Sequence, residues 1–141
     1  MTKIFAHRGA SAYAPENTME AFELAAKQGA DGIELDVHVT KDGEVVVTHD
    51  EKIDRVSNGS GFIKDMTLRE LKRLSFHNHM ESYVGAGIPT LREVLEYVST
   101  TNMDVNIELK TGIYWYPQIE EKTAFIVQET GMHDRVIYSS F

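Results

Sequence analysis

Nine residues, Asp31 to Val39, limit most tightly how this chain can fold. Apolar and polar side chains alternate along them, which is the pattern of a β-strand with two different faces. Glu34, Asp36 and His38 share one face, and Ile33, Leu35, Val37 and Val39 share the other. Strands of a parallel sheet are usually covered on both faces, so this acidic face needs paired charges or a metal ion.

The composition excludes several classes of function. The chain has 141 residues, 42% hydrophobic and 26% charged, as expected for one globular domain. A net charge of -8, without a lysine or arginine cluster, argues against nucleic-acid binding. Because cysteine is absent, a metal ion would need oxygen or imidazole ligands. The N-terminus lacks an apolar leader and no span of about 20 apolar residues follows, so we expect a cytoplasmic protein.

Strand and helix signals alternate along the chain, which predicts an α/β fold with a mainly parallel sheet. The first apolar run ends at His7-Arg8-Gly9, and a helix follows for which Asn17 is the expected N-cap. Residues 51–87 are predicted to form a small excursion between the regular elements. Capping boxes at Thr67 and Thr90, and Pro117 in a first turn, predict three further helices.

The acidic strand is predicted to form a hairpin with the apolar run that follows it, because the connection is too short for a crossover helix. If Asp42 and Gly43 form a two-residue loop, Lys41 pairs with Glu44. Counting back along both strands then places Asp36 directly opposite His49. We therefore expect a carboxylate and an imidazole to share one end of the hairpin.

Three kinds of side chain suggest a site for metal-assisted phosphoryl transfer. Carboxylates suit Mg²⁺, Ca²⁺ or Mn²⁺, imidazoles exchange protons near neutral pH, and cations bind phosphate. The candidates are the carboxylates Glu34, Asp36 and Glu108, the histidines His7 and His49, and the cations Arg8 and Lys110. Considered alone, the same charges fit a structural ion-pair network equally well. His38 lies nearer the turn and is interpreted as a bystander.

Seven short motifs follow one another along the chain. They are His7-Arg8-Gly9, Pro15-Glu16-Asn17-Thr18, Glu34-Leu35-Asp36-Val37, Thr40-Lys41-Asp42-Gly43, Val47-Thr48-His49-Asp50, Ile88-Pro89-Thr90-Leu91 and Glu108-Leu109-Lys110. In this order they resemble the glycerophosphodiester phosphodiesterases, within the phospholipase-C-like phosphodiesterases. The resemblance runs from about Ile4 to Phe141.

The resemblance implies a TIM-type barrel and the hydrolysis of glycerophosphodiesters to glycerol 3-phosphate and an alcohol. It assigns one divalent metal ion, Mg²⁺ or Ca²⁺, to the three carboxylates. It implies that His7 and His49 act as general acid and base, without deciding which is the acid. It also implies that Arg8 and Lys110 bind the substrate phosphate. Glu16 would not bind metal or substrate itself but would hold the site residues in place. The substrate would be a small glycerophosphodiester such as glycerophosphocholine.

A complete barrel of this type has about 250 residues and eight strands. The signals here suffice for about five strands, so we expect a partial barrel over residues 1–141. Its open edges would favour a homo-oligomer or assembly with another chain. Two alternatives follow: an inactive, metal-binding partial barrel, or a phospholipase similar to the sphingomyelinase-D enzymes.

Overall fold

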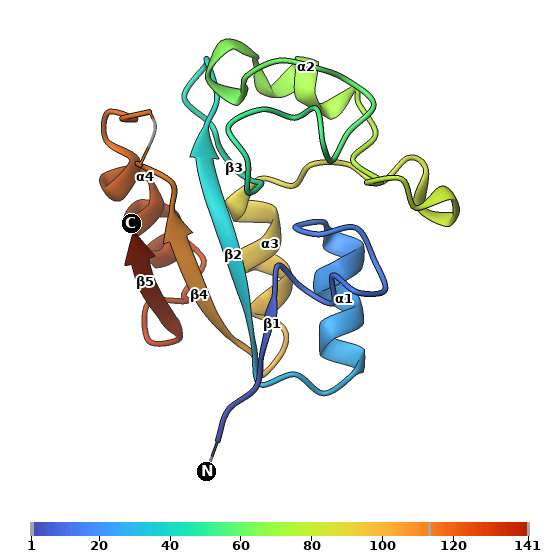
Figure 1. Ribbon diagram of the computed structural model, residues 1–141. Helices are drawn as coiled ribbons and strands as arrows, with labels where there is room; N and C mark the ends of the chain where they lie inside the picture. The colour runs from blue at the N-terminus through green and yellow to red at the C-terminus, as the bar shows by residue number, and fades with distance from the viewer. Residues whose placement is uncertain (1, 113, 141) are drawn as a thin grey trace.

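The computed structural model describes residues 2–112 and 114–140, which form one open sheet with helices on one face (Figure 1). Four strands run parallel in the order β1-β2-β4-β5, and β3 pairs antiparallel with β2. The strands are β1 (Phe5–His7), β2 (Gly32–Val39), β3 (Val45–Val47), β4 (Asp104–Leu109) and β5 (Val136–Ser140). The predicted mainly parallel α/β arrangement is confirmed.

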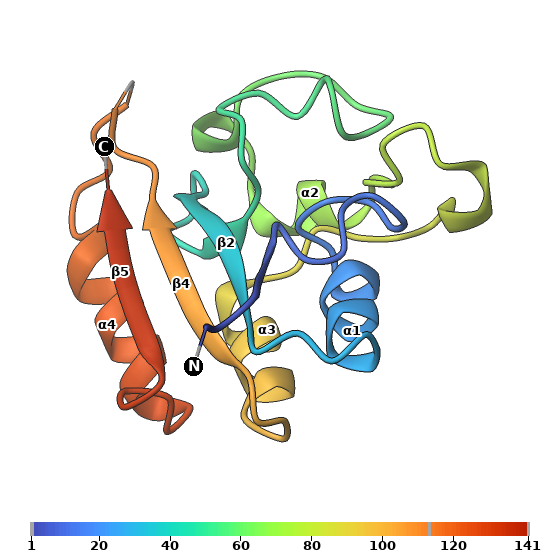
Figure 2. The same ribbon diagram turned by 60° about the horizontal axis from the view of Figure 1, so that its bottom comes forward.

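Of the main helices, the one nearest the N-terminus stands to the right of β1 in both views, and the others lie behind the sheet (Figures 1 and 2). The main helices are α1 (Met19–Lys27), α3 (Leu91–Val98) and α4 (Ile119–Glu129). Buried residues of all three share one hydrophobic cluster with the apolar face of β2, where Ile33, Leu35 and Val37 are fully buried. The alternation along β2 therefore separates the hydrophobic core from the acidic face.

The excursion, residues 51–87, lies near the carboxyl end of β2 (Figure 1). It contains the short helix α2 (Leu68–Lys72) and two 3-10 turns, Ile63–Asp65 and Glu81–Tyr83. A second hydrophobic cluster holds it, with Val46 of β3 packed among Ile53, Val56, Ile63, Leu71, Phe76 and Ile88. The two faces of β3 thus serve two cores, since Val45 and Val47 belong to the main one.

The start of α1 differs from the prediction. Thr18, not Asn17, is the N-cap, and its hydroxyl accepts a hydrogen bond from the amide of Ala21. Asn17 has a positive φ of 56° and uses its side-chain amide elsewhere, to donate to Asp36. The capping boxes of Thr67 and Thr90 form as predicted. Pro117 precedes α4, whose N-cap is Gln118.

The hairpin register is shifted by one residue from the predicted one. Val37 pairs with Val47, and the amide of Thr48 donates to the carbonyl of Asp36, so Thr48 takes the position predicted for His49. The loop has three residues because Thr40 closes it: its amide donates to the Glu44 carbonyl and its hydroxyl accepts from the Glu44 amide. Local side-chain hydrogen bonds of this kind compete with the two-residue turn.

β1 and β3 lie on the same edge of β2. The carbonyls of Glu34 and Asp36 point to one edge, because carbonyls two residues apart on a strand share a direction. The Glu34 carbonyl accepts from the amide of Arg8, after β1, and the Asp36 carbonyl accepts from the amide of Thr48, after β3. The two strands thus run toward each other along β2 and bring their carboxyl ends together at Asp36.

In the described residues, no helix combines the length and the apolar character that a membrane-spanning helix needs.

Candidate active site

The three predicted carboxylates meet on one face of the sheet. Glu34 and Asp36 lie on β2, and Glu108 on β4 is the direct register partner of Asp36. One carboxylate oxygen from each lies within 4.8 Å of the others. Asp36 is fully buried and Glu108 nearly so. The parallel pairing of β2 with β4, and not a local turn, therefore assembles the cluster.

The carboxyl group of Asp36 lies in surroundings that disfavour its negative charge. Burial, the adjacent carboxyl group of Glu108 and the negative charge of Glu34 raise its pKa to about 8. The hydrogen bond from Asn17 and the charge of Lys110 act in the opposite direction without cancelling that rise. Crowded carboxylates resolve their repulsion by retaining a proton or by binding a cation.

A divalent cation fits this cluster. Asp36 Oδ2 accepts from the Asn17 amide at 3.0 Å, whereas the buried Oδ1 has no hydrogen-bond partner in the described structure. Lys110 Nζ lies 3.8 Å from Oδ1, beyond hydrogen-bond distance. Three carboxylates with an unused buried oxygen form the hard donor set that Mg²⁺ and Ca²⁺ prefer.

The two predicted histidines flank the carboxylates from the ends of β1 and β3. His7 Nε2 lies 3.5 Å from Glu34 Oε2, and its side chain is 68% exposed. His49 is half-buried, and its Nδ1 lies 2.7 Å from Asp50 Oδ1. Because the Asp50 carboxylate accepts, His49 carries its proton on Nδ1, and Nε2 is free to accept one.

The two predicted cations lie beside the same cluster. Lys110 Nζ is 3.1 Å from Glu108 Oε2. Arg8 has a positive φ of 56°, and its Nη1 donates to Glu16 Oε2 at 3.1 Å. Its Nε is buried, lies 3.7 Å from Asp36 Oδ2 and has no hydrogen-bond partner among the described residues. The site thus offers an unused cationic donor, Arg8 Nε, close to a carboxyl group whose other oxygen, Asp36 Oδ1, is also unused.

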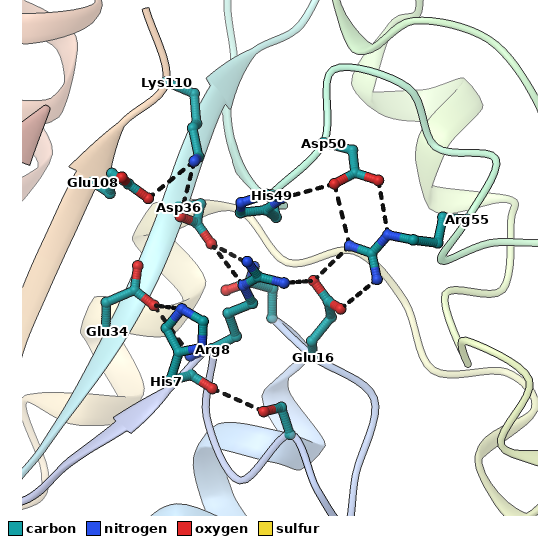
Figure 3. Close-up of polar contacts among 12 residues, drawn as sticks. His7, Arg8, Glu16, Glu34, Asp36, His49, Asp50, Arg55, Glu108 and Lys110 are labelled. Atoms are coloured by element: carbon teal, nitrogen blue, oxygen red, sulfur yellow. Dashed lines mark hydrogen bonds and ion pairs between the residues drawn. The ribbon is translucent and has the colours of Figure 1, made fainter. Parts of the chain in front are cut away.

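Glu16, predicted to order the site, joins a carboxylate and arginine network (Figure 3). Its two oxygens accept from Arg55 Nη1 at 2.7 Å and Nη2 at 3.0 Å, and one of them also accepts from Arg8. Burial alone would raise the pKa of Glu16, but the hydrogen bonds and charge of Arg55 and the charge of Arg8 lower it. Glu16 is therefore a buried anion that fixes the Arg8 guanidinium.

Sequence reasoning missed Asp50 and Arg55. Arg55 Nε donates to Asp50 Oδ2 at 2.9 Å, and Nη2 donates to Oδ1 at 3.2 Å. Partial burial would raise the pKa of Asp50, yet the hydrogen bonds from Arg55 and His49 lower it to about 2. A carboxylate directly after a candidate catalytic histidine was a usable signal for Asp50. Arg55 lies in an irregular segment that gave none.

His38 supports the site without being a ligand candidate. Its Nε2 lies 2.9 Å from the His49 carbonyl and its Nδ1 lies 2.8 Å from the Tyr116 hydroxyl. A carbonyl can only accept, so Nε2 donates to it, and Nδ1 of the neutral ring accepts from Tyr116. Burial lowers the pKa of His38, which favours this neutral form. Both ring nitrogens are thus engaged in holding the backbone of His49 and the loop of Tyr116.

Comparison with known proteins places the chain in a family. Residues 7–141 match the model of the glycerophosphoryl diester phosphodiesterase family. A glycerophosphodiester phosphodiesterase of Caldanaerobacter subterraneus subsp. tengcongensis is 52% identical over 141 residues, which are 99% of this chain and 58% of that protein. One of Bacillus subtilis is 41% identical over 159 residues, covering 96% of this chain and 51% of that protein.

Solved structures agree with these matches. A glycerophosphodiester phosphodiesterase from Agrobacterium tumefaciens superimposes with a TM-score of 0.90 and 42% identity, over 100% of this chain and 58% of that one. A phosphodiesterase from Oleispira antarctica, solved with the product sn-glycerol-3-phosphate, has a TM-score of 0.84 and 34% identity, over 100% of this chain and 58% of that one.

The chain spans a little more than half the length of these relatives. The predicted fold is confirmed: the five-stranded α/β sheet is a partial barrel of the same type. The family match and the superposition over the whole chain lead to one conclusion. This chain belongs to the glycerophosphoryl diester phosphodiesterase family.

Proposed function

We propose that this chain carries the residues for the metal-dependent hydrolysis of glycerophosphodiesters to glycerol 3-phosphate and an alcohol. The observation that carries the proposal is a pair of buried atoms without a hydrogen-bond partner among the described residues, Arg8 Nε and Asp36 Oδ1. They belong to groups that lie close together, since Arg8 Nε is 3.7 Å from Oδ2 of the same Asp36 carboxyl group. A phosphate ester beside a divalent cation would satisfy both atoms. The Oleispira relative, which holds sn-glycerol-3-phosphate, supports this substrate class.

The phosphate is assigned to Arg8 and Lys110. Glu16 holds the Arg8 guanidinium by Nη1 and leaves its Nε available for a phosphate oxygen. Lys110 Nζ lies on the other side of Asp36, near Glu108. A planar guanidinium and an ammonium that flank the carboxylates can orient a phosphodiester and offset its negative charge.

Glu34, Asp36 and Glu108 would hold the metal ion, with Mg²⁺ or Ca²⁺ favoured by the all-oxygen ligand set. When bound, such an ion supplies Lewis-acid stabilisation of negative charge that develops on the phosphoryl group. The chain's own contribution is to fix the three carboxylates: strand register places Glu108 against Asp36, and the Asn17 amide holds Asp36 Oδ2.

His7 and His49 would move the protons. One takes a proton from the glycerol hydroxyl next to the phosphate as its oxygen bonds to phosphorus, while the other gives a proton to the oxygen of the leaving alcohol as that bond to phosphorus breaks. Water then opens the cyclic phosphate to give glycerol 3-phosphate. The Asp50 carboxylate keeps the proton of His49 on Nδ1, so its Nε2 is the atom that exchanges a proton with substrate. His7 is more exposed and lies beside Glu34.

The deciding experiment is hydrolysis of glycerophosphocholine by this chain, with Mg²⁺ or Ca²⁺ and then with a chelator. We expect glycerol 3-phosphate only with the cation, and none from Glu34→Ala. Glu120→Ala is the matched control, because Glu120 is an exposed glutamate on α4 and should keep full activity. Product formation that neither the chelator nor Glu34→Ala reduces would rule the metal-dependent mechanism out.

A further inference from the structure

Arg55 connects two carboxylates that lie on different parts of the chain (Figure 3). It belongs to the excursion, residues 51–87, whereas Glu16 precedes α1 and Asp50 follows β3. Its guanidinium donates four hydrogen bonds, two to Asp50 at 2.9 and 3.2 Å and two to Glu16 at 2.7 and 3.0 Å. One planar group therefore fixes both carboxylates at once.

Each of these carboxylates also accepts a hydrogen bond from one residue of the proposed active site. Asp50 Oδ1 accepts from His49 Nδ1 at 2.7 Å, and Glu16 Oε2 accepts from Arg8 Nη1 at 3.1 Å. The hydrogen bonds thus run without a break from His49 through Asp50, Arg55 and Glu16 to Arg8. Arg55 therefore links the imidazole of His49, the proposed proton carrier, to the guanidinium of Arg8, the proposed phosphate ligand.

Arg55 also offsets a repulsion between the two carboxylates. The Glu16 side chain is 9% exposed and the Asp50 side chain 28%, so water screens their charges only in part. Asp50 acts on Glu16 as a like charge, which opposes their proximity. Without the Arg55 guanidinium the two carboxylates would repel each other and draw His49 and Arg8 apart.

We propose that Arg55 is a positioning residue that couples the orientation of His49 to that of Arg8. The inference rests on the proposed function, in which these two residues act on the same phosphodiester. It gives the excursion a chemical role: a segment outside the sheet sets the relative geometry of two loops at the sheet's carboxyl end. Arg55 itself need not touch the substrate.

Three variants separate positioning from charge and from stability. Arg55→Met removes the fork and keeps the aliphatic stem. Arg55→Lys keeps the charge, but one ammonium cannot form two bidentate pairs. Arg92→Met is the matched control, since Arg92 has a similarly exposed side chain, 41% against 46%, and forms a surface ion pair with Glu129.

The first readout needs no activity. Imidazole ¹⁵N spectra of the whole chain should show His49 with its proton on Nδ1 in the parent and in Arg92→Met. Arg55→Met and Arg55→Lys should both show a mixture of tautomers, because Asp50 loses its fixed orientation. If Arg55→Lys gives the parent spectra, the positive charge alone orients His49 and the bidentate pairs are not needed. If Arg55→Met gives the parent spectra, the proposal is wrong.

The second readout is kinetic, with glycerophosphocholine and the divalent cation. We expect Asp50→Asn to lower mainly kcat and Glu16→Gln to raise mainly KM. Arg55→Met should do both, with kcat reduced roughly 10- to 100-fold. Adding Asp50→Asn to Arg55→Met should cause no further loss of kcat, because the two residues act as one unit.

Additive losses, or a change in only one kinetic constant, would contradict the coupling. If the parent chain hydrolyses nothing, the proposed function fails, while the tautomer spectra still decide the role of Arg55.

Discussion

Asp36 and Glu108 are direct register partners on β2 and β4, and this pairing presses two carboxylates together in a buried part of the sheet. Hydrophobic packing of the strands enforces the contact although the like charges oppose it. The pKa of Asp36, raised to about 8 by burial and by its acidic neighbours, measures that conflict. The first prediction about stability follows from this pair.

The first prediction concerns cation binding. Mg²⁺ or Ca²⁺ at 100 times its dissociation constant should raise the free energy of unfolding by about 2.7 kcal/mol. Asp36→Asn should abolish this gain, yet raise the melting temperature of the cation-free chain, because it removes a crowded buried carboxylate. Thermal melts with cation and with chelator measure both effects. Asp65→Asn, whose parent side chain is 61% exposed, should respond like the parent chain, and a cation effect that survives in Asp36→Asn would contradict the site.

The second prediction concerns acid stability and Asp50. Its pKa of about 2 lies below the ordinary 3.8, so the folded state holds fewer protons than the unfolded state between these values. Asp50 therefore stabilises the fold above pH 4, and this contribution is lost as the pH falls from about 4 to 2. Allowing for partial exposure, the contribution is at most about 2 kcal/mol.

Urea unfolding of the parent chain and of Asp50→Asn, from pH 6 down to pH 2, tests this. The stability difference between them should be largest at pH 6 and should vanish near pH 2. Asp134→Asn is the control, since the Asp134 side chain is 89% exposed, and it should follow the parent curve throughout. A difference that is constant over this range would mean that Asp50 and Arg55 do not interact as the structure shows.

Local patterns in the sequence were enough to find the strands and the acidic face of β2. Alternation identifies Glu34 and Asp36 because strand periodicity is a property of neighbouring residues. The pairing of Asp36 with Glu108 joins residues far apart in the chain: strand patterns name both as candidate metal ligands, but their direct register appears only in the structure. The hairpin register failed for a local reason: Thr40 closes a three-residue loop with its side chain, and a rule based on Asp42-Gly43 does not include that bond.

The remaining differences involve polar residues that work across elements. Asn17 has the right side chain for a helix cap, but its positive φ of 56° is not the extended backbone of an N-cap, and its amide points to Asp36, so Thr18 caps the helix. Arg55 lies in a segment without periodicity, and its four hydrogen bonds depend on the placement of β3 and of the loop before α1. Sequence patterns describe single elements, whereas these contacts arise only when several elements meet.

The third prediction concerns the loop that carries Arg8. A Cβ on Gly9 would lie 2.7 Å from the Cβ of Ala21 and 2.8 Å from its carbonyl carbon, so the loop and α1 touch through this glycine. Gly9→Ala should cost about 2–4 kcal/mol of unfolding free energy, from the clash together with the positive φ of 80°. It should also displace Arg8.

Gly29→Ala is the control for backbone strain. Gly29 has almost the same φ, 79°, but nothing lies within 4 Å of the position that a Cβ would take there, so only the conformational cost of about 1 kcal/mol applies. Chemical denaturation measures both variants. Equal losses in the two would show that the contact between Gly9 and Ala21 is not tight.

The last prediction concerns the buried contact between His38 and Tyr116. Tyr116→Phe removes the donor that satisfies His38 Nδ1 and leaves a fully buried nitrogen without a partner. We expect a loss of about 1–2 kcal/mol in the free energy of unfolding, measured by urea denaturation. Tyr13→Phe is the matched control, because Tyr13 is 69% exposed and its hydroxyl can bond water in either state.

His38 also donates to the His49 carbonyl, so Tyr116→Phe should reduce kcat for glycerophosphocholine more than it changes KM. If Tyr116→Phe and Tyr13→Phe are equally stable, His38 does not depend on this hydroxyl, and the support of His49 through His38 must be abandoned.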